Sequence, residues 1–145
     1  MLFKSKIYIS IFLLNISLII TNCADNVLSP NVKSFTLADT VQINYKEKLS
    51  NSDENLSIEF YKLITDSRCP EDVICVWEGD TELKFQLIKN SDSILFSLHS
   101  NKSFSNSDST IFGYNIELVN VEPYPNTQIH YNTSDYSAYI IIKKQ

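Results

Sequence analysis

Residues 82–87 read E-L-K-F-Q-L, and this alternation of apolar and polar side chains decides the fold class. Successive side chains of an extended chain point to opposite faces, so Leu83, Phe85 and Leu87 share one face. Strict alternation of this kind is typical of a strand that is buried on one face and hydrated on the other. We therefore predict a half-buried strand in this segment.

The same alternation recurs along the chain, at residues 41–45, 56–60, 94–98, 114–118 and 138–142. A strand over residues 73–77 and a first strand near Phe35 bring the expected number to about eight. Clusters of Ser, Asn and Asp, which cap turns with their own side chains, separate these strands at 50–55, 89–93, 100–109 and 130–135. The spacing predicts an all-β fold, a single antiparallel β-sandwich.

Rare residues gather in one stretch, residues 66–79, which read D-S-R-C-P-E-D-V-I-C-V-W-E-G. The stretch contains the only arginine, the only tryptophan and two of the three cysteines of the chain. We predict that Cys69 and Cys75 form a short-loop structural disulfide. The acidic neighbours Glu71 and Asp72 disfavour the thiolate that a redox-active cysteine needs.

Arg68 stands out because lysine is the default cation of this chain. A planar guanidinium is favoured where several fixed acceptors must be met at once. We expect Arg68 to pair bidentately with Asp66 or Glu78, or to donate to loop carbonyls and so lock the loop to the sheet. The alternative is that Arg68 is an exposed anchor for a binding partner.

Two aromatic residues are further candidates for binding. A strand beginning at Val73 would place Trp77 on the same face as Cys75, so we expect the indole to cover the disulfide in the core. Tyr124 lies between two prolines that end the preceding strand at Glu122. We expect this ring to fold back as a lid on the core. The alternative for both is an exposed platform for a ligand or partner.

Composition and motifs exclude several classes of function. The formal net charge is −5, and no basic stripe interrupts the acidic balance, so we expect no binding to nucleic acid. The chain has no G-x-S-x-G elbow, no H-E-x-x-H motif and no glycine-rich phosphate loop. Its acidic residues fit no EF-hand loop, and its two histidines lie far apart along the chain. We therefore predict no catalytic residue, no metal site and no cofactor.

The N-terminal residues 1–22 are predicted to be a lipoprotein signal peptide. Lys4 and Lys6 precede an apolar run that is shorter than the roughly 20 residues of a membrane span. The run ends in I-I-T-N-C, which resembles a bacterial lipobox and makes Cys23 the predicted lipidation site. The alternatives are that this segment is an uncleaved membrane anchor or an ordinary secretion signal. Residues 23–33 would form a tether and residues 34–145 the β-sandwich domain.

Two segments also resemble those of a known group of proteins. D-S-R-C-P-x-x-V-x-C-x-W-x-G at residues 66–79 and Y-x-I-x-L-x-x-V-x-P-Y-P at 114–125 resemble motifs of small bacterial lipoproteins and secreted domains of unknown function. Glu78 stands where an alanine is usual in that group. The resemblance implies an extracytoplasmic β domain and brings no activity with it.

Together these patterns predict a lipid-anchored protein of the cell envelope that acts as a binding or structural module rather than as an enzyme. Ala24 follows the lipidated cysteine, which in diderm bacteria favours sorting to the outer membrane. We expect the partner that this module binds in the envelope to be another protein. The alternatives are a protease inhibitor that presents rigid loops, and an envelope hydrolase in which His99 meets a carboxylate in a cleft.

Lipidation provides the first testable prediction. Mass spectrometry of the protein purified from its own membranes is expected to find a diacylated or triacylated N-terminal Cys23. The Cys23→Ser variant should lose both the acyl mass and the membrane association. An intact, unmodified N-terminal segment in the wild-type protein would contradict the proposed anchor.

Overall fold

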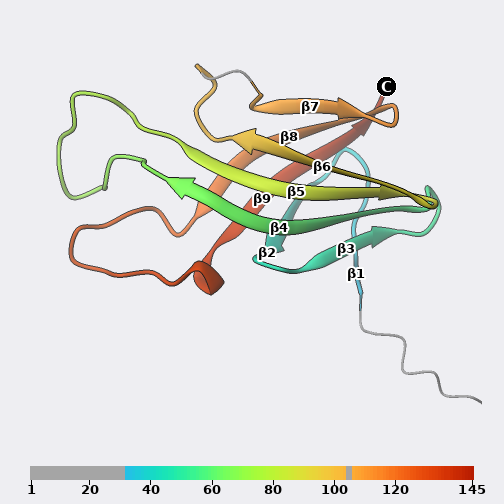
Figure 1. Ribbon diagram of the computed structural model, residues 1–145, viewed down its shortest axis with the longest axis horizontal. Coiled ribbons are helices and arrows are strands. Elements are labelled where there is room, and N and C mark those ends of the chain that lie inside the picture. The colour runs from blue at the N-terminus through green and yellow to red at the C-terminus, as the bar shows by residue number, and fades with distance from the viewer. Residues whose placement is uncertain (1–31, 104–105) are drawn as a thin grey trace, which may run out of the picture. The chain divides into compact units, whose positions relative to one another are not determined.

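Two β-sheets face each other in the computed structural model, which describes residues 32–103 and 106–145 (Figure 1). The first sheet has the order β1 (Lys33–Ser34), β3 (Lys48–Asn51), β4 (Leu56–Asp66), β5 (Thr81–Lys89) and β6 (Asp92–His99). The second has the order β2 (Thr40–Asn44), β9 (Ser137–Lys144), β8 (Tyr114–Glu122) and β7 (Asp108–Ile111). The helical turn η1 (Thr133–Asp135) precedes β9.

The predicted all-β sandwich is confirmed, with one exception to its antiparallel pairing and three differences in its strands. β1 pairs with β3 in parallel, whereas the other neighbours run antiparallel. The short strands β3 and β7 were not expected from the sequence. The predicted strand at residues 73–77 is wrong, because these residues form an irregular loop between β4 and β5.

The core lies between the two sheets and is made by the alternating residues. Each of the half-buried segments expected from the sequence contributes at least one buried side chain: Ile43, Leu56, Ile58, Phe60, Leu83, Phe85, Leu87, Leu98, Tyr114, Ile116, Leu118, Ala138, Ile140 and Ile142. Phe85 is central, with its ring centroid 5.5 Å from that of Phe60 and 5.9 Å from that of Phe96. Period-2 alternation therefore located the core correctly.

The chain enters this domain at one end of the first sheet and forms its longest connections at the other. Lys33 in β1 pairs with Leu49, which in turn pairs with Ile58 near the start of β4. From there β4 runs to Asp66, a distance of about 25 Å along an extended strand. The β4–β5 and β8–β9 connections both lie beyond that far end (Figure 1).

The predicted signal peptide, Cys23 and most of the predicted tether lie outside the described residues. Residues Val32–Gln145 form a compact unit of their own. Within the described ranges, no helix has both the length and the apolar character needed to cross a membrane.

Candidate functional site

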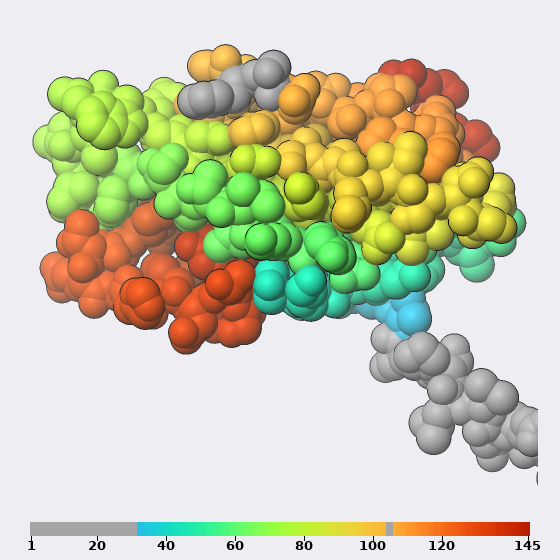
Figure 2. Space-filling model, viewed as in Figure 1, coloured from blue at the N-terminus to red at the C-terminus, as the bar shows by residue number. Residues whose placement is uncertain are grey.

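Two long loops meet at the end of the sandwich where β4 and β8 finish. The disulfide loop comprises residues 67–80 between β4 and β5, and the proline loop comprises residues 123–136 between β8 and β9. Figure 2 shows the yellow-green atoms of the first and the orange-red atoms of the second at the same end of the molecule. Both motifs singled out in the sequence therefore belong to one surface.

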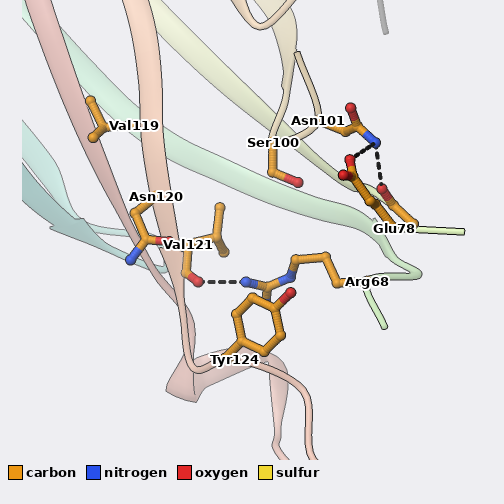
Figure 3. A pocket seen from close by; sticks show the side chains of 9 residues that line it. Arg68, Glu78, Ser100, Asn101, Val119, Asn120, Val121 and Tyr124 are labelled. Atoms are coloured by element: carbon orange, nitrogen blue, oxygen red, sulfur yellow. Dashed lines mark hydrogen bonds between the residues drawn. The ribbon is translucent and has the colours of Figure 1, made fainter. Parts of the chain in front are cut away.

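Arg68 connects the two sheets at this end. Its side chain is buried, and its Nε and Nη2 donate to Asp66 Oδ1 and Oδ2 at 2.9 and 2.7 Å. Nη1 donates to the carbonyl oxygen of Val121 at 2.6 Å, as Figure 3 shows. Nη2 also donates to the carbonyl oxygen of Pro123 at 2.7 Å. One guanidinium thus joins the end of β4 to the end of β8.

This geometry confirms the predicted bidentate pairing of Arg68 with Asp66. The carbonyls that it contacts belong to β8 and the proline loop rather than to its own loop. Since only 8% of Arg68 is exposed, the alternative of an exposed anchor for a partner does not fit. Arg68 instead positions the surface around it.

Asp66 collects hydrogen bonds from several parts of the fold. Besides Arg68, it accepts from Thr81 Oγ1 at 2.9 Å and from Tyr136 OH at 3.1 Å. Burial alone would raise the pKa of the Asp66 carboxyl, but the hydrogen bonds and charge of Arg68, together with the Thr81 hydroxyl, outweigh it and lower the pKa. Burial, together with this same carboxylate, raises the pKa of Tyr136. Asp66 is therefore held as an anion at the joint between the sheets.

The two loops are also hydrogen-bonded to each other farther out. Glu71 N donates to the carbonyl oxygen of Pro125 at 3.0 Å, and Asn126 Nδ2 donates to Glu71 Oε1 at 3.1 Å. Thr127 N donates to Asp72 Oδ1 at 2.9 Å, and the Thr127 hydroxyl donates to Asp72 Oδ2. These contacts brace the outer part of the disulfide loop against the proline loop.

The base of the disulfide loop continues the β4–β5 pairing beyond the strands. Ser67 N donates to the Asp80 carbonyl at 2.7 Å, and Cys69 N donates to the Glu78 carbonyl at 3.1 Å. Gly79 has φ +72° between these two pairs, and a Cβ there would lie 1.9 Å from the Ser67 carbonyl oxygen. The positive φ and the close approach of the Ser67 carbonyl both require a glycine at this position.

Cys69 and Cys75 form the predicted disulfide, with their Cα atoms 5.9 Å apart. The expectation that Trp77 covers this bond in the core is wrong, because 69% of Trp77 is exposed. The strands end at Asp66 and Thr81, so residues 70–78 extend past both sheets, where no second layer exists to bury an indole. The disulfide closes the loop on itself, and Arg68 attaches the loop to the sandwich.

An apolar tip therefore remains in solvent, formed by the side chains of Val73, Ile74, Val76 and Trp77. Ile74 is fully exposed, and Val76 is 92% exposed. These residues line an open apolar groove of about 400 Å³, which also includes the two cysteines, Glu78 and Tyr124. Sequence reasoning missed Ile74 and Val76. The sequence did contain a signal for them, because the run V-I-C-V-W is apolar without interruption, whereas a half-buried strand alternates apolar and polar residues.

Tyr124 lies where the two loops meet. Its ring centroid is 4.9 Å from the Arg68 guanidinium carbon, and the ring remains 40% exposed. The expected lid is thus formed over Arg68 rather than over the apolar core. Tyr124 also lines both the apolar groove and a second cavity, which brings it together with Trp77 as part of one surface.

The second cavity, here called the polar groove, has a volume of about 330 Å³ (Figure 3). One wall is formed by β8 residues Val119–Val121, and the other by Glu78, Gly79, Ser100 and Asn101. Arg68 and Tyr124 complete its lining. Glu78 and Tyr124 line both grooves, so the two grooves are neighbours that share these side chains.

His99 does meet a carboxylate, as the hydrolase alternative required. Its Nδ1 lies 2.6 Å from Asp80 Oδ2, while Asp80 Oδ1 accepts from Asn101 N at 3.0 Å and Ser100 Oγ at 3.3 Å. Neither His99 nor Asp80 lines the polar groove. The pair closes the turn after β6 instead. Among the described residues, no group of three or more His, Cys, Asp or Glu side chains is placed to hold a metal ion.

Comparisons of this chain with protein-family models, with curated proteins and with solved structures found no match. The resemblance carried by residues 66–79 and 114–125 therefore stays a prediction. The function proposed below rests on the geometry of the two loops.

Replacing Arg68 should destabilise the whole domain. Arg68→Ala leaves the buried Asp66 carboxylate without its counter-charge and two carbonyls without this donor, and we expect a loss of about 3–5 kcal/mol in the free energy of unfolding. Arg68→Lys restores the positive charge but not the planar group with several fixed donors. This variant should therefore recover only a small part of the lost stability. Urea unfolding measures both, with Lys62→Ala on the exposed face of β4 as the control. Wild-type stability in Arg68→Lys would contradict this role.

The depressed pKa of Asp66 predicts a loss of stability in acid. Its ionised form stabilises the fold above the pKa of the unfolded carboxyl, about 3.9, and this stability disappears as the pH falls through the lower folded value. The free energy of unfolding should therefore fall less between pH 6 and pH 3 in Asp66→Asn than in the wild type. The exposed Asp53→Asn should keep the wild-type slope. Equal slopes in all three proteins would refute the assignment.

Removing the disulfide should loosen the tip more than it destabilises the domain. The hydrogen-bonded base and Arg68 remain in the Cys69→Ser/Cys75→Ser variant, so we expect a stability loss of at most about 2 kcal/mol. Trp77 is the only tryptophan, so its fluorescence anisotropy reports the tip directly. The anisotropy should fall in the variant and in the reduced wild-type protein. Unchanged anisotropy would show that the disulfide does not order the tip.

Proposed function

We propose that this protein is a lipid-anchored module of the cell envelope that binds a protein partner through the apolar tip. The observation that carries this proposal is the exposure of Val73, Ile74, Val76 and Trp77 on a loop that is held at its base and closed by a disulfide. Burial of such side chains in a complex contributes about 25 cal/mol per Å² of apolar surface. Contiguous exposed apolar side chains are therefore typical of interaction sites.

The construction of the loop supports binding rather than local disorder. Arg68 and Gly79 define its base, the contacts of Glu71 and Asp72 brace its outer part, and the disulfide closes residues 69–75. A loop that is already ordered loses less conformational entropy when a partner binds. Trp77, which is part of this surface, is of a residue type enriched among binding hot spots.

Charge and position favour a protein partner over a lipid bilayer. Glu71, Asp72 and Glu78 flank the tip and are exposed, so they would repel anionic headgroups. The chain enters the domain near the opposite end of β4, about 25 Å from the loops. An anchor at Cys23 would therefore attach to the end of the domain that lies away from the tip. Sorting to the outer membrane, indicated by Ala24, completes the proposed location.

A protease inhibitor is the second candidate, and one specific observation favours it. The disulfide loop and the proline loop lie side by side and are hydrogen-bonded to each other, through Glu71–Pro125 and Asp72–Thr127. Rigid loops suit a protease inhibitor, because a preorganised loop loses little conformational entropy when it binds. A panel of envelope and secreted proteases assayed with micromolar wild-type protein separates this candidate from other partners.

Photo-crosslinking in the cells that make the protein tests the proposed function. A photoreactive residue at Val76 in the tip should give a discrete protein adduct, while the same residue at Leu95, exposed on β6, should not. The captured partner, once purified, should bind Trp77→Ala at least about tenfold more weakly than the wild type. Adducts that form equally from both positions, or only with lipid, would refute the proposal.

A further inference from the structure

The polar groove beside the apolar tip has an accessible negative charge and no accessible positive one. Two charged residues line it, Arg68 and Glu78. The Arg68 side chain is only 6% exposed, and its charge is compensated by Asp66 at 2.7 Å. Glu78 is exposed, and its carboxylate has one long contact of 3.5 Å, from Asn101 Nδ2, within the described part of the chain. A ligand in the groove therefore meets the carboxylate and not the guanidinium.

The position of Glu78 is fixed although its side chain is exposed. Its carbonyl oxygen accepts from Cys69 N in the base of the disulfide loop. The neighbouring Gly79 carbonyl accepts from Asn101 Nδ2 at 2.9 Å, which ties this wall of the groove to the turn after β6 (Figure 3). The carboxylate thus projects from a backbone that is hydrogen-bonded on both sides.

The chemistry of the groove favours a cation. The remaining lining is uncharged, and the protein as a whole carries a net charge of −5. An anion would be repelled by Glu78, and a purely apolar group would leave that carboxylate without water or a partner. A volume of about 330 Å³ accommodates one long side chain.

We propose that the polar groove binds a lysine side chain of the protein partner whose apolar surface covers the tip. This inference rests on the proposed function, since Glu78 and Tyr124 border both grooves and a segment seated on Trp77 leads directly past them. The ammonium pairs with Glu78, and the aliphatic stem lies along Val119 and the Tyr124 ring. The partner is thus recognised by an apolar contact next to a basic residue.

A direct test uses small probes on the full-length protein in detergent micelles. N-acetyl-lysine N-methylamide should shift the NMR resonances of Gly79, Asn101 and Asn120, while the norleucine analogue, which lacks the ammonium, should not. Glu78→Gln should weaken lysine binding about twofold to fivefold, the range expected of an exposed ion pair, and added salt should weaken it too. Asp92→Asn, an exposed carboxylate at the start of β6, is the control. Equal shifts with norleucine, or unchanged binding in Glu78→Gln, would overturn the proposal.

A second arm separates a partner's lysine from a free amine. The Glu78→Gln change, placed in the protein with the photoreactive residue at Val76, should lower the yield of the cross-linked adduct. An undiminished yield, with the lysine probe still binding, would overturn the assignment to the partner while leaving the tip as its binding site. If the protein with the photoreactive residue at Val76 and an unchanged Glu78 forms no adduct at all, the proposed function is refuted. The probe measurement does not depend on that result.

Discussion

The buried ion pair between Asp66 and Arg68 is the interaction on which the arrangement of the two loops at the end of this sandwich depends. Two sheets that share a core still need a connection at their ends, where the strands stop and apolar packing becomes thin. Arg68 provides it by contacting a carboxylate on β4 and two carbonyls at the end of β8 with one planar group. A lysine cannot meet these acceptors together, which accounts for the single arginine of the chain.

Burying this pair has a desolvation cost that a simple apolar contact would avoid. The gain is geometric, because each donor and acceptor fixes a different segment: Thr81 begins β5, Tyr136 precedes β9, and Pro123 starts the proline loop. The disulfide has a more local effect, since it closes only residues 69–75. The position of the disulfide loop and the order of its tip thus have separate causes. Arg68 determines where the loop lies, and the disulfide limits how its tip moves.

The parts of this structure that follow from local pattern could be predicted, and those that follow from distant contacts could not. Alternation located most strands and the core because it reflects burial on one face of a sheet. It missed β3 and β7, whose four-residue sequences K-L-S-N and D-S-T-I contain too little alternation. Asp66 was predictable as a partner of Arg68 because it is two residues away. Val121 lies 53 residues away, and only the assembled sandwich brings its carbonyl to the guanidinium.

Trp77 shows why the candidate site was harder to predict than the fold. Its burial was inferred from a face shared with Cys75, which requires a strand and a second sheet layer above it. Neither exists beyond the ends of β4 and β5, so the same residue becomes exposed. Tyr124 then links the structural role of Arg68 to the proposed binding surface, because Arg68 lies against its ring while Tyr124 lines both grooves. Any change that releases Arg68 must also move the surface that a partner would contact. The stability of the joint and the shape of the site are therefore consequences of one ion pair.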